Sequence, residues 1–86
     1  MNDETLIYTG PTIFALALER FKIFRGGLPF FVKRAIDKIP EIEKMIVPVS
    51  ELESMRSKIN SPGSNEARIF YAIQKAAEKF RVKAVK

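Results

Sequence analysis

Residues 23–38, IFRGGLPFFVKRAIDK, decide how this chain is expected to fold, because they hold its sharpest local break. Gly26 and Gly27 stand together within the stretch, and glycine is typical of the position just beyond the C-terminal end of a helix. A proline follows two positions later, and proline is favoured in the first turn of a helix. The stretch therefore predicts a bend between two helices, over residues 11–25 and 29–39.

Apolar side chains recur at the spacing of one helix face in four segments, which are residues 11–25, 29–39, 50–59 and 64–80. In the first segment the apolar stripe is formed by Phe14, Leu18, Phe21 and Phe24. Ser50 and Glu53 have the spacing of a capping box at the start of the third segment. Ser64 or Asn65 is expected to cap the fourth.

These segments predict an all-α fold, a compact bundle of about four helices in a single domain over residues 1–86. Within it we expect an N-terminal arm (residues 1–10) and a basic tail (residues 83–86). Residues 5–9 (TLIYT) and 45–47 (MIV) are rich in strand-forming side chains. A minor two-stranded β element that pairs these two runs stays open.

The composition argues against several classes of protein. The chain has no cysteine and no histidine, so it lacks the usual transition-metal ligands and the common nucleophile–base pairs of enzymes. We therefore expect no enzyme, no metal and no cofactor. The longest mostly apolar run, residues 11–18, is far shorter than the roughly 20 residues of a membrane-spanning helix. The acidic start (MNDET) does not match a signal peptide and the lack of cysteine fits a reducing compartment, so we expect a cytoplasmic location.

Positive charge is concentrated in two parts of the chain, whose overall net charge is +5. Residues 19–38 hold six cations and two anions, and residues 75–86 hold five cations and one anion, a net +4 in each case. Residues 41–53 hold four acids and one lysine, a net −3. Clustered cations suit an anionic partner, which favours a small nucleic-acid-binding regulator or accessory protein. The candidate phosphate contacts are Arg25, Lys33, Arg34, Lys38, Lys75, Lys79, Arg81 and Lys83.

The bend has the general form of a helix-turn-helix, in which residues 29–39 would enter a DNA major groove. Phe30 and Phe31 argue against this interpretation, because recognition helices usually present polar side chains in their first turn. A plain helical hairpin with a solvated basic face explains the same pattern. Cations near a helix C-terminus are also favoured by the helix dipole, whatever the function.

The adjacent side chains of Phe30 and Phe31 cannot both face one core from a single helix. We expect one of them to be exposed or to contact a partner. This gives a second class of function, a protein-interaction module such as an adaptor, inhibitor or subunit that docks through these aromatics and its asymmetric charge. A symmetric homodimer is the default assembly.

Overall fold

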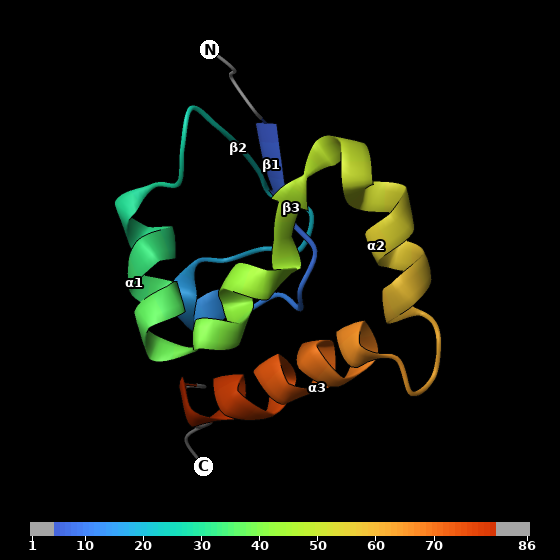
Figure 1. Cartoon of the computed structure of the whole chain (residues 1–86). Helices are drawn as coiled ribbons and strands as arrows, with labels where there is room; N and C mark the ends of the chain where they lie inside the picture. Colours follow the sequence, from blue (N-terminus) through green and yellow to red (C-terminus); the bar gives the residue numbers. More distant parts are fainter. Residues whose placement is uncertain (1–4, 81–86) are drawn as a thin grey trace.

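A computed structural model describes residues 5–80 (Figure 1). The strands among these residues are β1 (Thr5–Tyr8), β2 (Ile23–Arg25) and β3 (Ile46–Pro48). The α-helices are α1 (Phe30–Lys38), α2 (Leu52–Ile59) and α3 (Asn65–Ala77). Short 3-10 helices connect or extend them: η1 (Phe14–Leu16), η2 (Pro40–Met45), η3 (Val49–Glu51) and η4 (Glu78–Phe80).

The prediction of an all-α bundle is wrong, because the strands form a three-stranded antiparallel sheet in the order β2-β1-β3. β1 pairs with β3 at Ile7↔Val47, and these are the two runs considered for a minor element. β1 also pairs with β2 at Leu6↔Phe24, in a part of the chain expected to be helical. The second pairing places β1 in the centre of the sheet and makes the architecture mixed α/β.

The expected helix over residues 11–25 is absent. Ala17 and Phe21 have φ angles of 57° and 70°, in the left-handed region, which a right-handed helix cannot contain. Phe14, expected on the apolar stripe, is 85% exposed, whereas Leu18 is fully buried. The helical spacing of these side chains therefore did not reflect a common buried face.

The glycine pair ends a strand and not a helix. Gly26 and Gly27 have φ angles of 72° and 111°, which other residues rarely adopt. These angles turn the chain from β2 toward α1, which begins directly after Pro29. The predicted bend between two helices is wrong, while the helix expected over residues 29–39 is present as α1.

The two later helices lie where the sequence predicts them, but only one has the expected cap. Ser64 caps α3, since its side-chain oxygen accepts a hydrogen bond from the Ala67 backbone N–H at 3.0 Å. The capping box at Ser50 is wrong, because α2 is preceded by η3 and its N-cap, Glu51, makes no side-chain hydrogen bond. The chain instead enters α2 through a tighter 3-10 turn.

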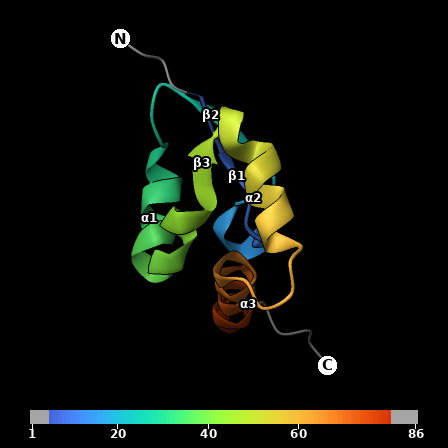
Figure 2. The same ribbon diagram turned by 45° about the vertical axis from the view of Figure 1, so that its right-hand side comes forward.

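α1 and α2 lie on opposite sides of the strands, and α3 crosses beneath them (Figures 1 and 2). The core between these elements includes Tyr8 of β1, Val32 of α1, Ile42 and Met45 of η2, and Ile73 of α3, each 0% exposed. Close packing of side chains from all these elements is what holds the layers together. No helix in residues 5–80 combines the length and the apolar character needed to cross a membrane.

The chain leaving β1 is tied to this core by two buried hydroxyl groups. The Tyr8 hydroxyl donates a hydrogen bond to the Pro11 carbonyl at 2.7 Å, and the Thr9 hydroxyl donates to the Met45 carbonyl at 2.7 Å. Gly10 follows Thr9 and lies directly against the Tyr8 ring, where an added Cβ atom would lie only 2.6 Å from the phenol oxygen. This corner sets the course of residues 11–15, which form one wall of the site described below.

Candidate functional site

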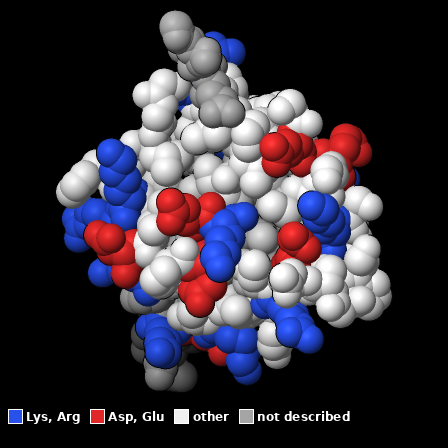
Figure 3. All heavy atoms as spheres, in the orientation of Figure 1, with Lys and Arg blue, Asp and Glu red and all other residues white. Residues whose placement is uncertain are grey.

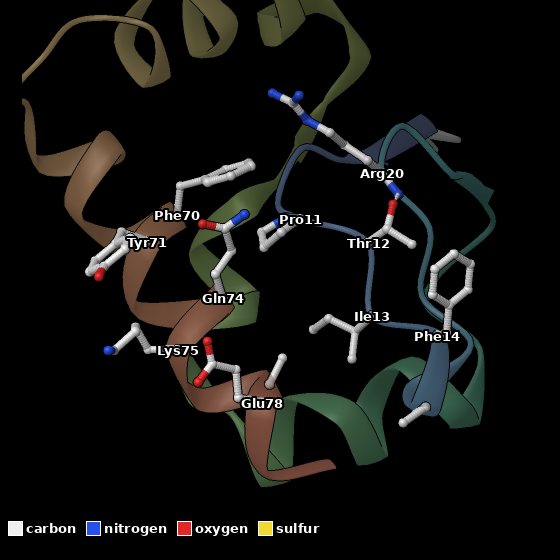
Figure 4. Close-up of a pocket in the computed structure, with 12 residues that line it drawn as sticks. Pro11, Thr12, Ile13, Phe14, Arg20, Phe70, Tyr71, Gln74, Lys75 and Glu78 are labelled. Atoms are coloured by element: carbon white, nitrogen blue, oxygen red, sulfur yellow. Dashed lines mark hydrogen bonds between the residues drawn. The ribbon is translucent and has the colours of Figure 1, made fainter. Parts of the chain in front are cut away.

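An open groove of about 970 Å³ lies between residues 11–15 and α3 (Figure 4). Pro11, Thr12, Ile13 and Phe14 lie along one side, and α3 presents Phe70, Tyr71, Gln74 and Lys75 along the other. Arg20 lies at one end and Glu78 lies beyond the last turn of α3. The groove thus combines aromatic rings, hydrogen-bonding groups, two cations and one carboxylate.

Arg20 is held in place at its end of the groove. Its guanidinium lies 4.6 Å from the ring centre of Phe21 and 5.0 Å from that of Phe70. Its Nε donates a hydrogen bond to the Thr9 carbonyl at 3.3 Å, and its backbone N–H donates to the Thr12 hydroxyl at 3.1 Å. Contacts with two aromatic rings limit the motion of the side chain, so its charge has a fixed position.

A second, shallower hollow of about 300 Å³ lies between the η1 turn and α1. Ala15, Leu16 and Ala17 line one side, and α1 contributes Phe31, Arg34, Ala35 and Lys38. Ala15 lines both hollows, so they adjoin across this turn. Phe14 at the start of the turn is 85% exposed. The turn is therefore a ridge with cations on either side of it.

The structure brings together three of the predicted phosphate contacts around this ridge. Arg34 and Lys38 line the hollow on the α1 side, and Lys75 lines the groove on the α3 side. Three others, which are Arg25, Lys33 and Lys79, are exposed but line neither hollow. The last two, Arg81 and Lys83, lie outside the described residues.

Lys75 is the one residue lining the groove that was predicted as a site residue, and the missed residues include Arg20, Phe14 and Tyr71. Arg20 and Phe14 were assigned to a helix that does not exist, and Tyr71, which is 59% exposed, lies in a predicted helix but was given no role. The Lys75 ammonium lies 5.8 Å from the Tyr71 ring centre. Tyr71 and Lys75 are four positions apart, and residues at this spacing are neighbours on the surface of a helix. An aromatic residue followed by a cation at this spacing is a sequence signal that could have indicated the pair.

The helix-turn-helix interpretation is wrong, because the segment before the glycine pair contains β2 and not a helix. α1 therefore lacks the first helix that would cross the DNA backbone in that motif. Its first turn also presents Phe30, which is 73% exposed. α1 contributes cations to a surface, but it has no partner helix to position it in a major groove.

The aromatic pair on α1 is divided between the surface and the core. Phe30 is exposed, and the Arg34 guanidinium lies 5.8 Å from its ring centre. Phe31 is partly buried and packs against the core, with the Lys22 ammonium 5.8 Å from its ring centre. Only Phe30 is therefore placed to contact a partner through most of its ring.

Charged side chains of both signs cover the face seen in Figure 3. Lys and Arg gather over α1 and along α3, whereas Asp and Glu lie over η2 and the start of α2. The acidic part corresponds to the net-negative residues 41–53 noted in the sequence. On this face the mixed charges over η2 separate the cations of α1 from those of α3 (Figure 3). The two groups are closer at the η1 turn, where Ala15 lines both hollows.

No family model matches this sequence, and searches of curated proteins and of solved structures found no match. Among residues 5–80, no three carboxylate, imidazole or thiol side chains gather in a way that could hold a metal ion. Burial raises the pKa of Tyr8 well above its ordinary value, but its hydroxyl is already used in the bond to Pro11. The groove is therefore the feature from which a function can be argued.

Proposed function

We propose that this protein binds nucleic acid and contacts phosphates through the cations of α1 and α3. One observation carries the proposal: the two hollows that adjoin at Ala15 are both lined by cations, and together these come from both basic parts of the sequence. Arg34 and Lys38 lie on one side of the ridge, and Lys75 on the other. A nucleic-acid backbone carries one negative charge on each phosphate, and these repeated charges suit cations that are spread along a surface.

The proposal includes the role expected from the composition, a small regulator or accessory protein of the cytoplasm. Binding would be driven mainly by release of counterions from the nucleic acid, so it would weaken steeply as salt increases. Glu78 is the carboxylate that lines the groove, where Arg20 and Lys75 supply two positive charges. The local balance therefore favours an anion.

Charge reversal on either side of the ridge tests the proposal. We expect Arg34→Glu and Lys75→Glu each to weaken binding of a mixed-sequence oligonucleotide and to lower the salt slope by about 0.7–0.9 for each phosphate that the protein no longer neutralises. Lys58→Glu is the matched control, because Lys58 is exposed on α2 and lines neither hollow. Fluorescence anisotropy over a salt series measures both quantities, and circular dichroism checks that each variant is folded.

Absence of binding at low salt would refute the proposal. It would also be refuted if Lys58→Glu weakened binding as much as Arg34→Glu and Lys75→Glu, since the attraction would then depend on net charge and not on this surface.

A protein-interaction module remains the second candidate, because Phe30 is 73% exposed and Ile23 is 56% exposed. Exposed apolar side chains of this size are typical of contact surfaces when they occur together. In this alternative, Phe30→Ser would abolish association with a protein partner or a second copy and leave the fold intact. Light scattering of the natural protein and of Phe30→Ser over a concentration series would report the loss of a dimer.

A further inference from the structure

We infer that the groove between residues 11–15 and α3 accepts unpaired bases, so that the ligand is single-stranded nucleic acid. This inference rests on the proposed function and specifies its substrate class. It depends on the kinds of side chain that meet in the groove, on its size, and on its continuity with the cations of α1.

Two exposed aromatic rings lie at the two outer edges of the groove, Tyr71 beyond α3 and Phe14 beyond residues 11–13 (Figure 4). Phe14 on the η1 ridge is 85% exposed, and Tyr71 on α3 is 59% exposed. Rings exposed to this extent contribute little to the core, but each offers a flat face on which a base can stack. Stacking requires that the base be unpaired or at a strand end, because a duplex hides the faces of its bases.

The polar groups of the groove match the rest of a nucleotide. Arg20 and Lys75 supply positive charge at separate points along it, and the Gln74 amide lies between them on α3 (Figure 4). An amide can both donate to and accept from the edge of a base. The groove therefore contains a stacking surface, a group for base edges and cations for phosphate.

The size and the surroundings of the groove favour a single strand over a duplex. A volume of about 970 Å³ is at the upper end of the range of about 300–1,000 Å³ for sites that hold small organic molecules. Bases and sugars fit such a groove, whereas a duplex could contact only its rim. The absence of a helix-turn-helix in the described residues also removes the element that would read a major groove.

The strand would continue from the groove over the ridge to α1. Ala15 belongs to both hollows, and the α1 side presents Arg34 and Lys38 to the phosphates that follow. The small side chains of Ala15 and Ala17 let a backbone cross the turn closely. A flexible single strand can follow this bent path, whereas a stiff duplex cannot.

The test compares a fluorescein-labelled oligodeoxythymidine with a duplex of the same length, using the full chain at one low salt concentration. We expect the single strand to bind at least tenfold more tightly. Tyr71→Ala and Phe14→Ala should each weaken single-strand binding about 5- to 150-fold, the range for loss of one stacked base. Duplex binding should change less than about twofold, because it depends on phosphate contacts.

Two controls separate stacking from other effects. Ile23→Ala shortens an apolar side chain that is 56% exposed but lines neither hollow, so it should leave both affinities unchanged. Tyr71→Phe keeps the ring and removes only the hydroxyl, so it should retain single-strand binding. Since all three side chains are largely exposed, circular dichroism should show that the variants remain folded.

The possible failures are distinct. Salt-dependent binding with equal affinity for both probes, unaffected by Tyr71→Ala and Phe14→Ala, would overturn the inference and leave the proposed function standing. Equal weakening by Ile23→Ala would also overturn the inference, because the groove would then have no special role. Absence of binding to either probe would overturn both.

Discussion

Gly10→Ala is expected to destabilise the protein through one buried contact. The added Cβ would lie 2.6, 2.7 and 2.8 Å from the Oη, Cζ and Cε1 atoms of Tyr8. Ordinary contacts of a Cβ are 3.4 Å or longer, so the phenol would have to shift by 0.6–0.8 Å. Tyr8 is fully buried, and its shift would strain the 2.7 Å hydrogen bond from its hydroxyl to Pro11.

The expected loss of stability follows from these distances. Overpacking of a close-packed interior costs about 1–3 kcal/mol, and weakening of one hydrogen bond costs about 1 kcal/mol more. In a domain of this size each kcal/mol lowers Tm by about 4–8 °C. We therefore expect the free energy of unfolding to fall by about 2–4 kcal/mol, with a drop in Tm of at least about 8 °C. The assay is urea unfolding followed by circular dichroism, with a thermal scan beside it.

A double-mutant cycle tests the cause. Tyr8→Leu removes the end of the phenol, so Gly10→Ala should cost little in that background and the two substitutions should be strongly coupled. The reasoning would be refuted if Gly10→Ala cost less than about 0.5 kcal/mol in the natural sequence. An equal cost in both backgrounds would also refute it, because the Cβ would then not act through Tyr8.

Three further outcomes can be checked by the same unfolding assays. Thr9→Val should lower the free energy of unfolding by about 1 kcal/mol, because it removes the buried hydrogen bond from the Thr9 hydroxyl to the Met45 carbonyl. The Thr9 N–H still donates to the same oxygen at 2.8 Å, so a loss above about 3 kcal/mol would contradict this reasoning. Ser64→Ala should cost about 0.5–2 kcal/mol by removing the cap of α3, and Ser64→Asn should restore most of it. Stability should fall as pH rises above about 10. Burial raises the pKa of Tyr8 in the folded state above its value in the unfolded chain, so above pH 10 the unfolded chain loses this proton first and becomes more favourable. Tyr8→Phe should flatten this dependence, and an unchanged profile would show that other groups cause it.

The helices that could be predicted are those whose signals lie close together in the sequence. Pro29 begins α1 and Ser64 caps α3, and both residues act on the backbone within one turn. Such signals act locally, so no knowledge of the remaining fold is needed to interpret them. The strands are different, because the partner of Phe24 is Leu6, far away in the sequence.

The segment between Gly10 and β2 could not be predicted for a related reason. The spacing of Phe14, Leu18 and Phe21 matches a helix, but their burial depends on how β1 and β2 pair. Ala17 has a positive φ, which is uncommon for a residue other than glycine and has no sequence signal here. Tertiary pairing therefore overrode the local apolar pattern.

The candidate site was predictable only in its charge. Clustering of cations in the sequence indicated Arg34, Lys38 and Lys75, which line the two hollows. It could not indicate that the η1 turn would bring the two clusters to adjoining surfaces, because that depends on the path between β1 and β2. The exposed ring of Phe14 was hidden by the same error in the fold.

The central place of β1 in the sheet has a consequence for synthesis of the chain. β1 leaves the ribosome before both of its partners, because β2 and β3 follow only at residues 23–25 and 46–48. Both pairings are non-local, so each must close a loop before any stabilising interaction forms. Until Pro48 has emerged, one edge of β1 stays unpaired and can template the addition of another chain. A pause in translation between β2 and β3 would therefore expose nascent chains to misassembly, whereas a pause after β3 would not.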